Sequence, residues 1–265
     1  MLRWEIIMNQ KVVFFDIDGT LLNSQKQILD STKLAISKLK DNGIIPFIAT
    51  GRPPFMFEWL REELDIQNYI SINGQYVVIN GVVIFENTLE MEAVKKLSAD
   101  ALTNEHYMAF YNHETYRANY GEHPYIKESF DSFQMESPGI DKEFHLHHPI
   151  HQGILFCPTS EEDYYKAAYP GFDFIRWHRY ALDVLPKGSS KLVGIMEALK
   201  TLNVDVKDSY AFGDGLNDFA MIKHAGNGIV MENGHPELKK VAAYITASCD
   251  NDGISKGLKH FKLID

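Results

Sequence analysis

Short continuous apolar runs recur at both ends of the chain, and a stretch with helical periodicity follows most of them. Runs that are apolar at every position are typical of parallel strands covered on both faces of a sheet. We expect such strands at residues 11–15, 44–49, 69–72, 209–212 and 227–230. Helical spacing predicts helices at residues 30–41, 190–202 and 218–224, and a fourth that Pro53 and Pro54 open and that ends near Leu64. The alternation predicts an α/β core with a parallel sheet.

The middle of the chain follows a different pattern. Two apolar runs, 75–79 and 82–85, flank Asn80-Gly81, which is a strong signal for a two-residue hairpin turn. Beyond it the expected strands are short and mixed with helices, at residues 107–111, 150–156 and 172–177. More than half of the aromatic residues and most of the histidines lie between residues 107 and 180. We therefore expect residues 86–184 to form an inserted α+β domain between core segments 1–85 and 185–265.

Composition and charge restrict the partners of the chain. Acidic residues outnumber basic ones by 36 to 26, which gives a net charge of −10 over 265 residues. This sign disfavours a nucleic acid or an anionic membrane as the main partner, so an anionic substrate must be held by local cations. Cys157 and Cys249 form neither a metal-binding spacing nor a disulfide framework, which suits the reducing cytoplasm. No apolar stretch reaches about 20 residues, the length of a membrane span, and Met8 is an alternative start.

Two carboxylates stand directly after the first expected strand. Asp16 and Asp18 are followed by Gly19, and in open α/β sheets the carboxyl ends of the strands are where ligands bind. Residues two apart in an extended chain lean to the same side, so these like charges need a compensating cation. Mg²⁺ bound by oxygen ligands would neutralise both and anchor a phosphate. A simple loop start is the alternative interpretation of the pair.

A second polar segment follows the strand expected at 209–212. Asp214 and Asp218 could complete an oxygen cage with Asp16. The alternative is purely structural, because Asn217 is a good N-cap residue and Asp218 favours the first turn of a helix. Considered alone, the two interpretations are about equally supported, whereas the presence of the first carboxylate pair favours the cage.

Cations and donors for a phosphate are also present. Lys191 stands at the start of an expected helix, where the helix dipole disfavours a positive charge, so it is either solvated or recruited by an anion. Thr50 follows an expected strand and offers a hydroxyl and a backbone N–H to a phosphate oxygen. Arg52 lies two residues further and could reach the same anion. Taken singly, a threonine or a lysine such as Thr50 or Lys191 is more readily explained as a surface residue.

Four segments in this order resemble the motifs of the haloacid dehalogenase-like hydrolase superfamily. They are Asp16-Ile17-Asp18-Gly19-Thr20, Thr50-Gly51-Arg52, Lys191, and Gly213-Asp214-Gly215 with Asn217-Asp218. The long insert resembles the cap of the Cof-type sugar phosphatase subfamily. The resemblance implies a Rossmann-like parallel-sheet core, residues 1–85 and 185–265, with an inserted α+β cap, residues 86–184, that sets substrate specificity.

The resemblance also implies a role for each acidic residue. Asp16 would be the nucleophile that forms an aspartyl-phosphate, and Asp18 would be the general acid and base. Mg²⁺ would be bound by the Asp16 carboxylate, the backbone carbonyl of Asp18 and the Asp214 carboxylate. Asp218 would lie in the inner or the outer shell of the metal.

The phosphate-binding residues follow from the same resemblance. Thr50, with Gly51 and Arg52, and Lys191 would hold the phosphoryl oxygens as charge spreads over them. Asn217 would orient either Lys191 or the phosphate. The expected activity is Mg²⁺-dependent hydrolysis of small phosphorylated metabolites, sugar phosphates or similar, by a monomer or homodimer. A phosphomutase or phosphotransferase with the same intermediate, and a catalytically vestigial phospho-ligand-binding regulator, remain as alternatives.

Histidines in the insert give a weaker signal. His145, His147 and His151 are spaced so that they could face one side of a strand. A polar, partly exposed face of the cap is the favoured interpretation, ahead of a transition-metal site. His113 and Glu114 are minor candidates for a contact with substrate.

Overall fold

The computed structural model describes residues 10–121, 123–132 and 136–265, so the alternative start at Met8 lies outside the described residues. The chain forms two compact units. The first comprises the chain up to Arg52 and residues 57–85 and 190–265, and the second comprises residues 53–56 and 86–189. Among the helices of the described residues, none combines the length and the apolar composition needed to cross a bilayer.

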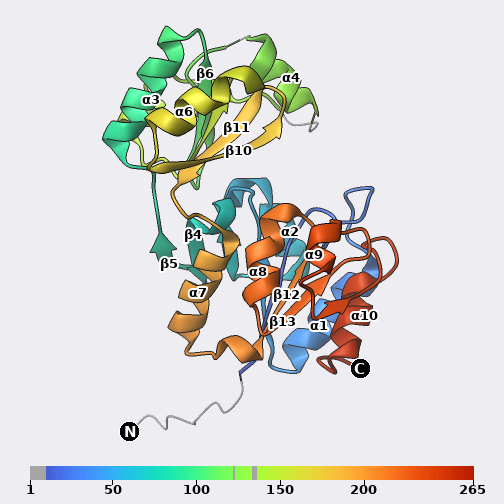
Figure 1. The fold of residues 1–265 in the computed structure, drawn as a ribbon. Helices are drawn as coiled ribbons and strands as arrows, with labels where there is room; N and C mark the ends of the chain where they lie inside the picture. The colour runs from blue at the N-terminus through green and yellow to red at the C-terminus, as the bar shows by residue number, and fades with distance from the viewer. Residues whose placement is uncertain (1–9, 122, 133–135) are drawn as a thin grey trace, which may run out of the picture. The chain divides into compact units, whose positions relative to one another are not determined.

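An eight-stranded sheet forms the centre of the first unit (Figure 1). Its strands are β1 (Val12–Phe15), β2 (Ile45–Ala49), β3 (Tyr69–Ser71), β4 (Tyr76–Ile79), β5 (Val82–Glu86), β12 (Ser209–Gly213), β13 (Asn227–Val230) and β14 (Tyr244–Ile245). Their order is β14-β13-β12-β1-β2-β3-β4-β5, and the pairs from β14 to β3 are parallel. The predicted Rossmann-like core is confirmed. Asn80 and Gly81, between β4 and β5, both have positive φ, as a tight hairpin turn requires.

Helices cover both faces of this sheet, because its strands are apolar on both sides. The helices of the first unit are α1 (Asp30–Asp41), α2 (Glu58–Leu64), α7 (Lys191–Leu202), α8 (Phe219–His224), α9 (Pro236–Lys239) and α10 (Gly253–His260). Buried residues of α1, α2 and α10 belong to one apolar cluster, and those of α7, α8 and α9 belong to the other. Three short 3-10 turns complete the unit: η2 (Ile72–Gly74), η4 (Val206–Asp208) and η5 (Leu216–Asp218).

The helix predicted from Pro53 to Leu64 is wrong in its first half. A 3-10 turn, η1 (Pro54–Met56), is followed by α2, which begins only at Glu58. Phe57 interrupts the two with a φ of −135° and is fully buried in the core of the first unit. Phe55 packs instead against an apolar cluster of the second unit. The non-helical backbone of Phe57 therefore separates the 3-10 turn from α2.

A six-stranded, mainly antiparallel sheet organises the second unit, in the order β10-β11-β9-β6-β7-β8. The strands are β6 (Tyr107–Tyr111), β7 (Tyr116–Ala118), β8 (Gly139–Ile140), β9 (Gln152–Phe156), β10 (Phe172–His178) and β11 (Ala181–Pro186). The helices are α3 (Met91–Thr103), α4 (Pro124–Ser132), α5 (Phe144–His147) and α6 (Glu162–Ala168), with the 3-10 turn η3 (Thr159–Glu161). His145 and His147 lie in α5, so the strand that was expected to align the histidines is absent there.

Candidate active site

The predicted polar residues converge at the carboxyl ends of three neighbouring strands. Asp16 follows β1, Thr50 follows β2 and Asp214 follows β12. The parallel register pairs the last residue of β1 with both neighbouring strands, and the backbone N–H of Asp16 donates to the carbonyl of Phe212 at 3.0 Å. A cavity of about 280 Å³ opens at this edge. Its lining residues are Asp16, Asp18, Thr50, Gly51, Arg52, Gly215 and Asn217.

Lys191 is a buried cation beside the cavity. It is the first residue of α7, and its side chain is fully buried. Its Nζ donates to Oδ1 of Asp16 at 2.5 Å and to Oδ1 of Asp218 at 2.6 Å. The sequence predicted an anionic partner for a lysine at a helix start, and here the partners are two carboxylates. Lys191 therefore joins the segment after β1 to the segment after β12.

Asp218 is occupied by donors on both of its oxygens. Besides the bond from Lys191, its Oδ2 accepts the backbone N–H groups of Asp214 and Gly215, both at 2.9 Å. Asp218 is fully buried, whereas a first-turn residue on a helix surface would be exposed. Its carboxylate thus fixes the loop after β12 and the position of Lys191 at the same time.

Asp214 contacts two residues of the segment after β1, Gly19 and Thr20. Oγ1 of Thr20 donates to Oδ1 of Asp214 at 2.9 Å. Gly19 has a φ of +75°, and a side chain at this position would collide with the Asp214 carboxylate. Only glycine fits here, because the backbone must approach Asp214 closely. Thr20 belongs to the first of the four motifs, but no role was predicted for it; its place next to Asp18-Gly19 was the available signal.

Asp18 is bound by two cations that the sequence did not assign to it. Arg52 donates from Nε to Oδ2 at 2.8 Å and from Nη2 to Oδ1 at 2.7 Å, and Lys26 donates to Oδ1 at 2.7 Å. Burial acts to raise the pKa of Asp18, but the bonds from Arg52 and Lys26 outweigh it and hold this pKa below its usual range. Arg52, predicted to hold phosphate, therefore pairs with Asp18 in this structure. Nothing in the local sequence around Lys26 indicated its contact.

Thr50 was predicted to offer its hydroxyl and its backbone N–H to a phosphate, and the structure differs for the N–H. Its backbone N–H donates to the carbonyl of Ile70 at 2.9 Å, as part of the pairing between β2 and β3, so this group is not available to a phosphate. That expectation was wrong, because the sheet continues past the last residue of β2. The hydroxyl oxygen accepts the backbone N–H of Arg52 at 3.1 Å, which leaves the hydroxyl proton for another acceptor.

Burial governs the titration of the acidic cluster. It raises the pKa of Asp16 to about 8, although Lys191 acts in the opposite direction, and it raises the pKa of Asp214 to about 6. Burial would lower the pKa of Lys191, but the charges of Asp16 and Asp218 outweigh it and leave that pKa above its ordinary value. Lys191 therefore stays charged, whereas the positive charge near Asp16 and Asp214 is too small to keep their pKa values at the ordinary level.

The donor set fits a hard divalent cation. Asp16, Asp214 and Asp218 each offer a carboxylate oxygen, and these oxygens lie within 4.8 Å of one another. When all are ionised, three carboxylates face one lysine, so two negative charges remain uncompensated. Oxygen-only ligands and an excess of negative charge suit Mg²⁺ better than a softer transition ion.

The chain is similar to known proteins over most of its length. The haloacid dehalogenase-like hydrolase family matches residues 13–258. The relative "Putative phosphatase YkrA" of Bacillus subtilis (strain 168) is 41% identical over 257 residues, which cover 97% of this chain and 100% of the relative. A solved structure of a hypothetical protein from Geobacillus kaustophilus HTA426 is 46% identical with a TM-score of 0.93, covering 96% of this chain and 100% of its own. The subclass IIB sugar phosphatase BT4131 is 31% identical with a TM-score of 0.82, covering 96% and 100%.

Proposed function

The chain belongs to the haloacid dehalogenase-like hydrolase family, and we propose that it is a Mg²⁺-dependent phosphatase of small phosphorylated metabolites. The observation that carries the proposal is the Asp16 carboxylate, which lines the cavity and accepts a hydrogen bond from the fully buried Lys191. A nucleophile fixed by a buried cation is suited to attack an anionic group.

Asp16 attacks phosphorus in line with the leaving oxygen. A bond forms between an Asp16 carboxylate oxygen and phosphorus, and the bond from phosphorus to the leaving oxygen breaks. Asp18 gives a proton to that oxygen and later takes one from the water that hydrolyses the aspartyl-phosphate. Asp18 is ionised while Arg52 and Lys26 hold it, so its first role requires that these bonds weaken. The substrate phosphate competes with Asp18 for the Arg52 guanidinium, and this competition would weaken the Arg52–Asp18 bonds.

Mg²⁺ would be held by the carboxylates of Asp16 and Asp214 and by the backbone carbonyl of Asp18. Because protein donors bind both oxygens of Asp218, we place Asp218 outside the first shell of the metal. The bound ion would supply positive charge that offsets repulsion between the Asp16 carboxylate and a phosphate dianion.

The phosphoryl oxygens would be held by residues of the cavity wall and by the lysine beside it. The Thr50 hydroxyl has a proton to donate, and Lys191 is an ammonium within reach of the Asp16 oxygens. Gly51, Arg52 and Asn217 line the same cavity, and we assign them to the phosphate as well.

Sugar phosphates are the substrate class we propose, and the second unit, as an α+β cap, would choose among them. The resemblance of the chain to the sugar phosphatase BT4131 supports this class. The test is a panel of phosphorylated metabolites with Mg²⁺, in which released inorganic phosphate and transferred phosphate are both measured. Phosphate release is expected. Transfer to a sugar without release would indicate a phosphomutase or phosphotransferase, and binding without turnover would indicate a regulator.

We also propose the cytoplasm as the working compartment, since Cys157 and Cys249 are both free thiols in the interior. The net charge of −10 disfavours a nucleic acid or an anionic membrane as the partner, and we propose a small phosphorylated metabolite held by local cations instead. A monomer or a homodimer is the assembly we expect.

A further inference from the structure

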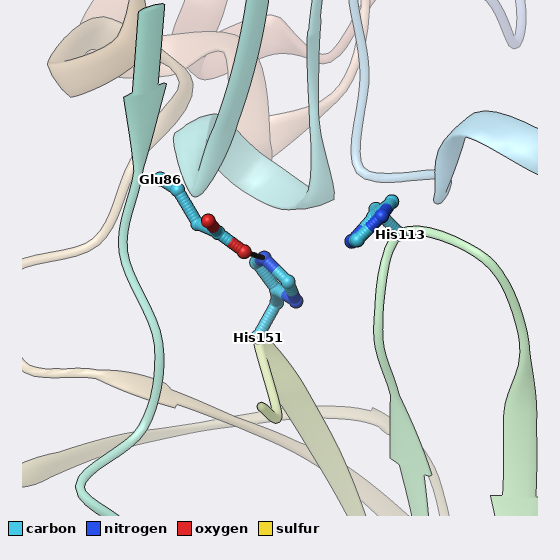
Figure 2. A group of neighbouring side chains, drawn as sticks. All are labelled: Glu86, His113 and His151. Atoms are coloured by element: carbon cyan, nitrogen blue, oxygen red, sulfur yellow. Dashed lines mark hydrogen bonds and ion pairs between the residues drawn. The ribbon is translucent and has the colours of Figure 1, made fainter. Parts of the chain in front are cut away.

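A second group of ligand-type side chains lies in the second unit, far along the chain from the carboxylate cluster. It consists of Glu86, His113 and His151, which we call the histidine cluster. Glu86 is the last residue of β5, His113 stands in the loop between β6 and β7, and His151 immediately precedes β9. Figure 2 shows Glu86 and His151 meeting end to end, with the ring of His113 across from them.

The three side chains are close enough to share one ion. Each offers one ligand atom, and these atoms lie within 4.8 Å of one another. Nε2 of His151 lies 2.9 Å from Oε1 of Glu86. The two imidazole rings are 5.8 Å apart between centroids and nearly perpendicular, at 85°, so they do not stack. Perpendicular rings can aim nitrogen atoms at a common point.

Hydrogen bonds fix the backbone around two of the three ligands. The N–H of His151 donates to the carbonyl of Tyr111 at 2.9 Å, which attaches it to the end of β6. The loop that carries His113 is a tight turn, because Oδ1 of Asn112 accepts the N–H groups of Glu114 and Thr115 at 2.9 and 2.8 Å. Two of the three ligands are therefore held on ordered backbone before any ion binds, which reduces the entropy lost on binding.

We propose that the histidine cluster binds Zn²⁺ or a comparable divalent transition ion. Two imidazole nitrogens and one carboxylate oxygen form a donor set that suits such ions, whereas Mg²⁺ prefers oxygen ligands alone. At zinc–ligand distances of about 2.0–2.2 Å, adjacent ligand atoms of a tetrahedral site lie about 3.3–3.6 Å apart. The Glu86–His151 contact, at 2.9 Å, would therefore lengthen slightly when the ion binds.

The burial pattern gives the site a closed and an open side. His151 is fully buried, whereas about 42% of the Glu86 side chain and about 33% of the His113 side chain are exposed to solvent. Three protein ligands leave at least one tetrahedral position for water or another oxygen ligand, on the side where solvent reaches. A bound ion would link Glu86, the last residue of β5, to the loop between β6 and β7 and to the start of β9.

The test measures zinc binding by the full-length protein in the presence of excess Mg²⁺, which is intended to occupy the carboxylate cluster. A chromophoric chelator competes for zinc, and X-ray absorption at the zinc edge identifies the ligands. We expect about one Zn²⁺ per chain, with two imidazoles in its first shell. Glu86→Gln and His113→Ala should each weaken binding by about 100-fold or more, because each removes one of three ligands. Both side chains are partly exposed, so both variants should fold, which circular dichroism checks.

Matched controls separate this site from the alternatives. His147 also lies near a glutamate, with its Nε2 3.8 Å from Oε2 of Glu143, but it is not part of a three-ligand group among the described residues. His147→Ala should leave zinc binding unchanged. Asp214→Asn should leave it unchanged as well. The proposal is overturned if zinc binding is absent, if it persists in folded Glu86→Gln and His113→Ala, or if it is lost only in Asp214→Asn.

Discussion

The two side-chain clusters of this protein contain carboxylates in opposite settings. In the first unit, Asp16 and Asp218 face a lysine that solvent does not reach, and Asp214 adds a third negative charge. In the second unit, a single carboxylate, Glu86, meets two imidazoles and remains partly exposed. The first cluster has a surplus of negative charge that a hard cation offsets. The second has nitrogen donors and little surplus charge, which favours a softer ion.

The difference lies also in what positions the side chains. Asp16 and Asp214 stand at the ends of adjacent parallel strands, and the register of the sheet brings them together. Glu86 and His113 are brought together by a loop and a strand end from distant parts of the sequence. A cluster built on strand ends is rigid and suited to chemistry, whereas in the second cluster the Glu86–His151 contact must lengthen slightly to admit an ion.

The largest expected effect separates the two carboxylates of the first motif. Asp16→Asn removes the nucleophilic charge at nearly constant shape, so we expect kcat to fall by about 10⁴-fold or more. No phosphoenzyme should form. Asp18→Asn keeps the nucleophile and removes the proton donor and the later base. Labelled phosphoenzyme should therefore accumulate in acid-quenched samples of Asp18→Asn with Mg²⁺.

Two substrates sharpen this test. p-Nitrophenol leaves without much need for a proton, so Asp18→Asn should retain part of its activity on p-nitrophenyl phosphate. A sugar phosphate releases an alkoxide, and its hydrolysis should suffer more. Equal losses on both substrates, with no trapped intermediate in Asp18→Asn, would contradict the proposed roles.

Lys191→Met should produce the next largest effect, on both rate and stability. Loss of the cation beside Asp16 removes transition-state stabilisation, so kcat should fall by about 10²-fold. It also leaves Asp16 and Asp218 buried without their partner, which should cost about 3 kcal/mol in the free energy of unfolding at pH 7. Urea unfolding and steady-state kinetics measure the two effects.

Lys26→Met is the matched control for this variant. Lys26 also binds a carboxylate of the site, Asp18, but its side chain is about two-thirds exposed. Exposed ion pairs contribute about 0–1 kcal/mol, so the unfolding free energy should change little. If Lys26→Met and Lys191→Met lost equal stability, burial would not be what makes Lys191 important.

Much of the first unit could be predicted because its signals are local. Apolar runs predicted seven of the eight strands of the central sheet, all except the two-residue strand β14 (Tyr244–Ile245), and the hairpin at Asn80-Gly81 followed from two residues. The convergence of Asp16, Thr50 and Asp214 followed from one rule, that the carboxyl ends of parallel strands share an edge. These features depend on near neighbours in the sequence or on a repeated architecture, and neither requires knowledge of side-chain packing.

The features that escaped prediction depend on tertiary contacts. The Arg52–Asp18 pair joins two loops, and the N–H of Thr50 is used by Ile70 on a neighbouring strand. The break at Phe57 accompanies the full burial of its side chain, which the local sequence does not indicate. The histidine cluster likewise has no sequence motif, because its members are distant in sequence and only the folded second unit brings His113 to His151.

Magnesium binding should depend on pH in a way that identifies the first cluster. In the metal-free protein the pKa values of Asp16 and Asp214 are raised from the ordinary 3.8 to about 8 and about 6. Protonated carboxyls in the folded state stabilise it at low pH, and this contribution is lost as pH rises through these two values. Mg²⁺ favours the ionised forms, so it should offset the loss.

We therefore expect the rise in Tm caused by Mg²⁺ to grow between pH 5 and pH 8, and the apparent Kd for Mg²⁺ to fall by about tenfold per pH unit where one proton is displaced. Scanning calorimetry and titration calorimetry across this range measure both. Asp214→Asn, which removes one ligand, should reduce the effect. A Tm shift that is equal at pH 5 and pH 8 would place Mg²⁺ elsewhere.

The smallest expected effect concerns Arg52, whose partner Asp18 has its pKa lowered below 3.8. A lowered folded-state pKa contributes stability above the unfolded value, and the contribution is lost as pH falls through the folded value. Because the Asp18 side chain is about 42% exposed, solvent screening limits the pair to about 0.5 kcal/mol. Arg52→Met should therefore cost about that amount at pH 7 and nothing near pH 2, measured by urea unfolding. If the Arg52 guanidinium also binds the substrate phosphate in place of Asp18, KM of Arg52→Met should rise about tenfold while its loss of stability stays small. A loss of several kcal/mol, with KM unchanged, would assign Arg52 to the fold alone.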